Sequence, residues 1–119
     1  MALGRKVTGG RYKKARKKKK HELGGQTRIV KLGEKKTKLM RVRGGKEKLV
    51  SLSQNKINII KNGKAKVVEI KNVIETPSNR FLARQNVLTK GAIVETELGK
   101  AKITNKPSQE GNVQGIIVE

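Results

Sequence analysis

Apolar and polar residues alternate in short segments from residue 26 onward, and turn-forming residues separate these segments. Such alternation is typical of β-strands with one buried face, whereas the spacing that an amphipathic helix requires is weak. The clearest unit is 57–70, where Asn62-Gly63 separates two apolar runs. Because Asn-Gly supports the positive φ angles of a two-residue type I′ turn, this unit predicts a β-hairpin.

A second hairpin is predicted over 93–104, where Gly99 follows Glu97-Leu98. Ala101 and Ile103 alternate with polar residues in its second half. Since successive side chains of a strand point to opposite faces, we expect both of these side chains to face the core.

Further alternating segments predict strands at 27–32, 38–43, 48–52 and 113–118. Short strands in this number suggest a closed or nearly closed β-barrel, because closure removes the sheet edges that pair nonspecifically. The segment 75–90 interrupts the pattern, and Pro77 either opens a short helix with Thr76 as its N-cap or holds a turn. The predicted fold class is all-β, a small barrel of about six short strands with a disordered basic N-terminal arm.

Positive charge is concentrated in the first part of the chain. The formal net charge is +21, and residues 1–48 hold 19 of the 30 Lys and Arg residues. Within 13–20, seven of the eight residues are Lys or Arg. A run this dense repels itself and cannot fold around an apolar core. The sequence therefore predicts a basic flexible arm over 1–24 and a β-barrel domain over 25–119.

Several classes of function are excluded by what the chain lacks. It has no Cys and no Asp, and His21 is its only His. Disulfides and Cys-ligated zinc are thus excluded, and no cluster of carboxylates or imidazoles is available for catalysis or for a metal. Glu95 and Glu97 can share one face of a strand, but we interpret them as exposed carboxylates of a hairpin. We expect no enzymatic activity, no cofactor and no small-molecule substrate.

A membrane partner is also not expected. No stretch is apolar enough for a secretory signal or a membrane span. Anionic membranes attract polybasic segments, but stable recruitment needs an apolar face or a lipid as a second signal. The arm has neither, so we expect a cytoplasmic protein, monomeric when free, whose partner is a nucleic acid.

The scarcity of aromatic residues restricts how a nucleic acid is recognised. Tyr12 and Phe81 are the only aromatic residues, so the stacking platform that reads unpaired RNA bases is missing. The chain also lacks the glycine motifs of mononucleotide and dinucleotide sites. With base stacking and mononucleotide sites set aside, the sequence favours recognition of folded RNA through its phosphates and 2′-hydroxyls.

Gly-Gly pairs occur at 9–10, 24–25 and 44–45, each within the basic part of the chain. Consecutive backbone N–H groups can form a concave anion site that suits a phosphate. The alternative is that these pairs are turns or flexible joints. For 24–25, at the boundary of the arm, the joint is the preferred interpretation.

Four motifs in this order resemble one family: Thr-Gly-Gly-Arg at 8–11, Lys-His-Glu-Leu-Gly at 20–24, Arg-Val-Arg-Gly-Gly at 41–45, and 79–94 with its Leu-Thr-Lys-Gly-Ala-Ile-Val ending. The chain resembles the eighth small-subunit ribosomal protein of archaea and eukaryotes, the e-type, and its length is similar to that of archaeal members. The resemblance implies a β-barrel with a basic extension, bound to small-subunit rRNA in the ribosome. His21 and Lys46 depart from the family pattern, which often has Tyr and Asn there.

The resemblance and the charge distribution together nominate the rRNA-binding residues. Most are cations, and the others are His21 and residues of the glycine motifs: Arg5, Lys6, Thr8, Gly9, Gly10, Arg11, Lys13, Lys14, Arg16, Lys17, Lys18, Lys19, Lys20, His21, Arg41, Arg43, Gly44, Gly45, Lys46, Arg80, Arg84 and Lys90. The main alternative is a non-ribosomal β-barrel protein that coats DNA or RNA. The sequence does not indicate which ribosomal proteins are neighbours.

Overall fold

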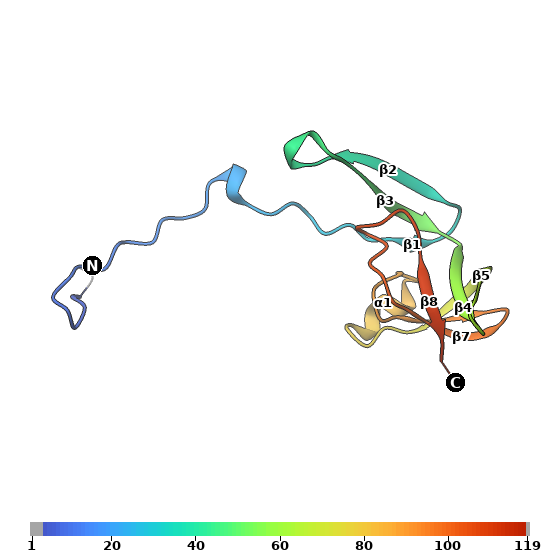
Figure 1. Cartoon of the computed structure of the whole chain (residues 1–119). Coiled ribbons are helices and arrows are strands. Elements are labelled where there is room, and N and C mark those ends of the chain that lie inside the picture. Colours follow the sequence, from blue (N-terminus) through green and yellow to red (C-terminus); the bar gives the residue numbers. More distant parts are fainter. Residues whose placement is uncertain (1–3, 119) are drawn as a thin grey trace.

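Strands dominate the computed structural model, which describes residues 4–118 (Figure 1). In chain order the elements are η1 (Lys20–Glu22), β1 (Lys31–Leu32), β2 (Lys36–Arg41), η2 (Arg43–Gly45), β3 (Glu47–Gln54), β4 (Lys56–Lys61), β5 (Lys64–Glu75), α1 (Arg80–Arg84), β6 (Ile93–Thr96), β7 (Gly99–Ile103) and β8 (Gln114–Ile117). The principal-axis extents are 65 × 34 × 29 Å, because the N-terminal segment runs away from the sheets. The predicted all-β class is confirmed.

The barrel is built from the second half of the chain. Strands β4 to β8 follow one another around it, and β8 closes it by pairing in parallel with β4. Its interior is aliphatic, with Ile57, Ile59, Val94, Ala101 and Ile103 all buried. The predicted closed barrel and the inward orientation of Ala101 and Ile103 are therefore confirmed, with five strands in the barrel itself.

Both predicted hairpins form. Asn62 and Gly63 have φ angles of 52° and 73°, the left-handed values that a type I′ turn demands at both central residues. In the second hairpin Thr96 lies opposite Gly99, and the Thr96 hydroxyl donates a hydrogen bond of 2.7 Å to the Gly99 carbonyl. Local turn chemistry thus fixes the register of the strands that enclose the core.

The upstream strands form a separate three-stranded sheet in the order β1-β3-β2. Its β2–β3 hairpin is antiparallel and extends beyond the barrel (Figure 1). The strand predicted at 27–32 is shorter, since only Lys31–Leu32 pair with another strand. Residues 28–30, which precede this strand, form hydrogen bonds with loops instead. The Val30 carbonyl accepts from the Leu88 N–H at 2.8 Å, and the Arg28 Nε donates to the Ser108 carbonyl at 3.0 Å.

A buried polar cluster fastens the β2–β3 hairpin to the loop that precedes β8. The Ser51 N–H donates to the carbonyls of Pro107 and Glu110 at 3.2 and 3.0 Å. The Gln54 Nε2 donates to the Ser51 hydroxyl and to the Gly111 carbonyl, both at 3.0 Å. Gln54 is only 3% exposed, so these bonds replace water that its amide would otherwise bind.

Replacing Gln54 by Ala is expected to lower the free energy of unfolding by about 1 to 3 kcal/mol, because it leaves buried partners without hydrogen bonds. Urea denaturation followed by circular dichroism measures the change. The exposed Gln26→Ala variant is the control and should change the free energy by less than about 0.5 kcal/mol. Equal effects of the two variants would contradict the role of the cluster.

The interruption at 75–90 contains the single helical turn α1. Its N-cap is Asn79, whose side-chain oxygen accepts a hydrogen bond from the Phe81 N–H at 3.0 Å. The predicted alternative with Thr76 as N-cap is wrong, because Thr76 is buried and its carbonyl accepts from the Asn79 N–H at 3.1 Å. Pro77 thus lies in a turn that leads into the helix.

Candidate nucleic-acid interface

The basic arm lies apart from the body. Every residue from 4 to 24 is exposed, and Figure 1 shows the segment as an extended chain. Within residues 4–118, the hydrogen bonds of this segment join arm residues to one another. The arm lysines therefore keep their ammonium groups in solvent, where an external anion can reach them.

The motif at 8–11 forms a tight turn. The Lys6 N–H donates to the Gly10 carbonyl at 2.8 Å, and the Gly9 N–H donates to the Lys6 carbonyl at 2.9 Å. The Arg5 guanidinium also donates to the Gly9 carbonyl at 2.9 Å. Gly9 has a φ of 83°. The turn interpretation of this glycine pair is thus confirmed, and the turn places the basic residues Arg5 and Arg11 opposite each other.

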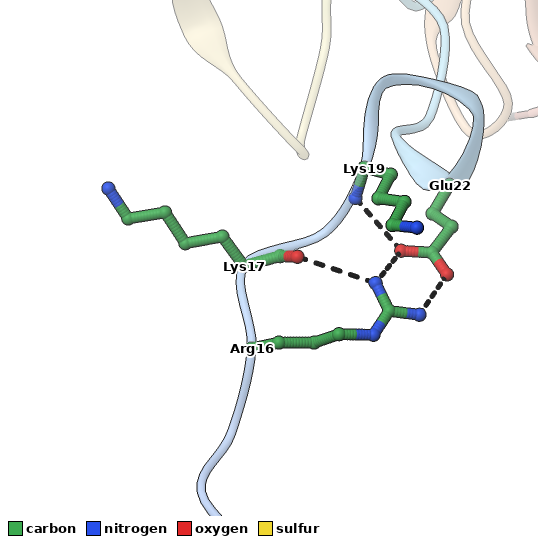
Figure 2. Close-up of polar contacts among 4 residues, drawn as sticks. All are labelled: Arg16, Lys17, Lys19 and Glu22. Atoms are coloured by element: carbon green, nitrogen blue, oxygen red, sulfur yellow. Dashed lines mark hydrogen bonds and ion pairs between the residues drawn. The ribbon is translucent and has the colours of Figure 1, made fainter.

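A second local contact bends the arm near its end (Figure 2). Arg16 and Glu22 form a bidentate ion pair, with nitrogen–oxygen distances of 2.8 and 2.6 Å. The Lys19 N–H donates to the same carboxylate at 2.9 Å. The Arg16 guanidinium, and secondly the Lys19 N–H, hold the pKa of Glu22 below its usual range. The contact is therefore kept at neutral pH and is lost when acid protonates Glu22.

The tip of the β2–β3 hairpin, residues 41–46, presents the third basic motif. The Val42 N–H donates to the Lys46 carbonyl at 2.8 Å and closes the loop. Gly44 and Gly45 have φ angles of 78° and 71°, a left-handed conformation that costs any residue with a Cβ. The pair is a structural turn, and it leaves the cations at 41, 43 and 46 exposed.

Two of the remaining predicted residues share one hollow. Arg80 and Arg84 lie one turn apart on α1 and line this hollow together with Asn72 and Asn86. None of the residues described around it is acidic. Sequence reasoning missed the two asparagines: Asn72 reaches this hollow only through the packing of α1 against β5, and Asn86, which follows α1, has no charge that would nominate it.

Lys90 lies at a different place from the α1 arginines. It lines a groove on the body together with Arg28 and Lys106. Sequence reasoning missed these two residues, since each is an isolated cation far from Lys90 along the chain. The one available signal was their positive charge, which they share with many surface lysines.

The predicted residues are all exposed, but they do not form one compact site. The arm is separate, while the hairpin tip and α1 lie on the side of the body from which the arm leaves (Figure 1). A long polyanion can contact these elements together, whereas a small ligand cannot.

Other site types are not supported by the described part of the chain. Among its residues, no group of three His, Cys, Asp or Glu is placed to hold a metal ion. Glu95 is exposed and lies opposite Lys100 in the β6–β7 ladder, as expected for a surface hairpin. No helix in the described residues is long and apolar enough to cross a membrane.

The closed aliphatic barrel has exposed cations on an arm, a hairpin tip and a short helix. These features define the class: a basic β-barrel protein suited to a polyanion. The profile of the family described as ribosomal protein S8e matches residues 2–118, and the chain belongs to this family. The resemblance read from the sequence motifs is thus confirmed.

Similar proteins carry the name small ribosomal subunit protein eS8. The one from Nanoarchaeum equitans is 44% identical over 117 residues, which cover 97% of this chain and 92% of that protein. The one from Haloarcula marismortui is 42% identical over 115 residues, covering 97% and 94%. The one from Methanococcus aeolicus is 43% identical over 117 residues, covering 96% and 91%.

Proposed function

We propose that this chain is a structural constituent of the small subunit of the cytoplasmic ribosome, and that it binds rRNA through the RNA backbone. Family membership supports the ribosomal role, because the relatives are named for the small ribosomal subunit. The observation that carries the mode of binding is the set of exposed cations on the arm, the hairpin tip and α1, without an aromatic stacking surface.

The arm and the body have different parts in this proposal. The arm, residues 1–24, threads between RNA helices and neutralises phosphates that would otherwise repel one another. Ordering it costs about 1 to 2 kcal/mol per residue, so it becomes rigid only when RNA is present. NMR order parameters over 5–24 should therefore be low in the free protein and rise on RNA addition. Uniformly high values without RNA would contradict the proposal.

Co-sedimentation tests the ribosomal role against the alternative of a nucleic-acid-coating protein. The protein is mixed with small subunits stripped of this protein and with an excess of duplex DNA at moderate salt. We expect it to sediment with the subunits, because a folded rRNA surface offers contacts beyond the nonspecific electrostatic attraction. Sedimentation with the DNA instead would overturn the proposal.

The glycine pair at the hairpin tip gives a further test. Replacing Gly44 and Gly45 by Ala should strain the tip by about 1 to 2 kcal/mol per residue and weaken rRNA binding about tenfold. Filter binding to small-subunit rRNA measures the affinity. The control replaces Gly24 and Gly25, which have no positive φ and open space around them. Equal losses in the two variants would show that the shape of the tip is not what the RNA recognises.

A further inference from the structure

Three chain segments that are distant in sequence line a groove on the body. They are 27–30, 87–90 and 106–109, and α1 adds Leu82. The Val30 carbonyl accepts from the Leu88 N–H, and Arg28 donates to the Ser108 carbonyl, so 27–30 is fastened to both other segments. The groove has a volume of about 540 Å³, within the range of about 300 to 1,000 Å³ that small-ligand sites occupy.

Apolar side chains make up much of this groove. Val87 and Leu88 are buried, and Leu82 is half-buried. Ile29 lines the same groove but remains 52% exposed, without a cover in the described residues. A phosphate alone would gain nothing from these side chains, so an occupant that matches the groove has a flat or apolar part.

Cations complete the groove. Arg28 is half-buried, and its side chain is held by hydrogen bonds of 3.0 Å from Nε to the Ser108 carbonyl and 3.2 Å from Nη1 to the Met40 sulfur. Lys90 and Lys106 are exposed, and none of the described lining residues is acidic. A fixed, planar guanidinium can stack on a base, and three cations without a carboxylate select an anionic occupant.

We propose that this groove takes one unpaired nucleotide of the bound RNA. The base packs against Ile29 and Leu82 beside the Arg28 guanidinium, and the flanking phosphates contact Lys90 and Lys106. An uncharged side chain of a neighbouring protein would fill the apolar part and leave the cations without partners. The inference rests on the proposed rRNA binding and adds that the body recognises a nucleotide displaced from its helix.

Methyl NMR of the full chain tests the site with two RNA probes, a single-stranded uridine hexamer and a ten-base-pair RNA duplex. We expect the hexamer to shift the methyl signals of Ile29, Leu82 and Leu88 in a saturable way, while the duplex leaves them unchanged. Equal shifts with both probes, or none with the hexamer, would overturn the inference. So would shifts caused only by an uncharged apolar peptide, which would make the groove a protein-docking site.

A charge-matched pair of variants separates this groove from general electrostatic attraction. Replacing Lys90 and Lys106 by Gln should raise the hexamer concentration that half-saturates the methyl shifts about tenfold. Replacing Lys100 and Lys102 by Gln removes the same charge from β7 and should leave that concentration nearly unchanged. If both variants raise the half-saturating hexamer concentration by the same factor, the groove does not hold the phosphates.

Filter binding of the wild-type chain to small-subunit rRNA is run in parallel. If rRNA binds tightly but the hexamer does not shift the methyl signals, this inference fails and the proposed function stands. If neither RNA binds, both fail.

Discussion

Replacing the six lysines of residues 13–20 by Gln is expected to weaken binding to small-subunit rRNA by at least about a hundredfold, the largest effect of any charge change in this chain. The six are exposed and make no ion pair in the described structure: Lys13, Lys14, Lys17, Lys18, Lys19 and Lys20. Each phosphate contact contributes about 0.7 to 0.9 to the slope of log affinity against log salt, so the slope should fall by about 4 to 5. Filter binding over a salt series measures both quantities.

The matched control removes the same charge from the body. It replaces six exposed lysines on β4, β5 and β7 by Gln: Lys61, Lys64, Lys66, Lys71, Lys100 and Lys102. Both variants keep the Arg16–Glu22 ion pair, so the bend in the arm is unchanged. The body variant should lose much less affinity and keep most of the salt slope. Equal losses would mean that total charge, and not the arm, drives binding.

Replacing Ile59 by Ala is expected to lower the free energy of unfolding by about 2 to 5 kcal/mol. Ile59 is 0% exposed at the centre of the barrel, so its loss removes apolar contacts and leaves a cavity. Because small domains are stable by about 5 to 15 kcal/mol, this one substitution removes a large part of the free energy of unfolding. Urea denaturation followed by circular dichroism measures it.

The neighbouring residue on β4 provides the control. Ile60 points out of the barrel and is 62% exposed, so Ile60→Ala should change the free energy of unfolding by less than about 0.5 kcal/mol. Since side chains alternate along a strand, equal effects at these two positions would contradict the register of β4 against β5 and β8.

The parts of the fold that depend on local chemistry could be predicted from the sequence. Asn62-Gly63 fixes its hairpin because the turn and both strands lie within one short segment. The division of the strands between a barrel and a second sheet could not be predicted, since it depends on which distant strands pair. The parallel pairing of β8 with β4 closes the barrel, and no local sequence pattern predicts this pairing.

The same distinction holds for the candidate interface. The arm and the hairpin tip could be predicted because their cations and glycines are consecutive in the sequence. The groove could not, since Arg28, Lys90 and Lys106 meet only when three distant segments pack together. The bend at Arg16 was also not predicted, because the sequence does not indicate which of the many neighbouring cations pairs with Glu22.

Crosslinking in native small subunits, with both the nucleotides and the protein residues mapped, tests the central claim most directly. It reports the partner and the contact surface in one measurement. The account predicts rRNA crosslinks at arm residues 5–20 and at the hairpin tip, with few at the exposed lysines of β7. Arm residues that crosslink to no RNA, while β7 carries the RNA contacts, would contradict it.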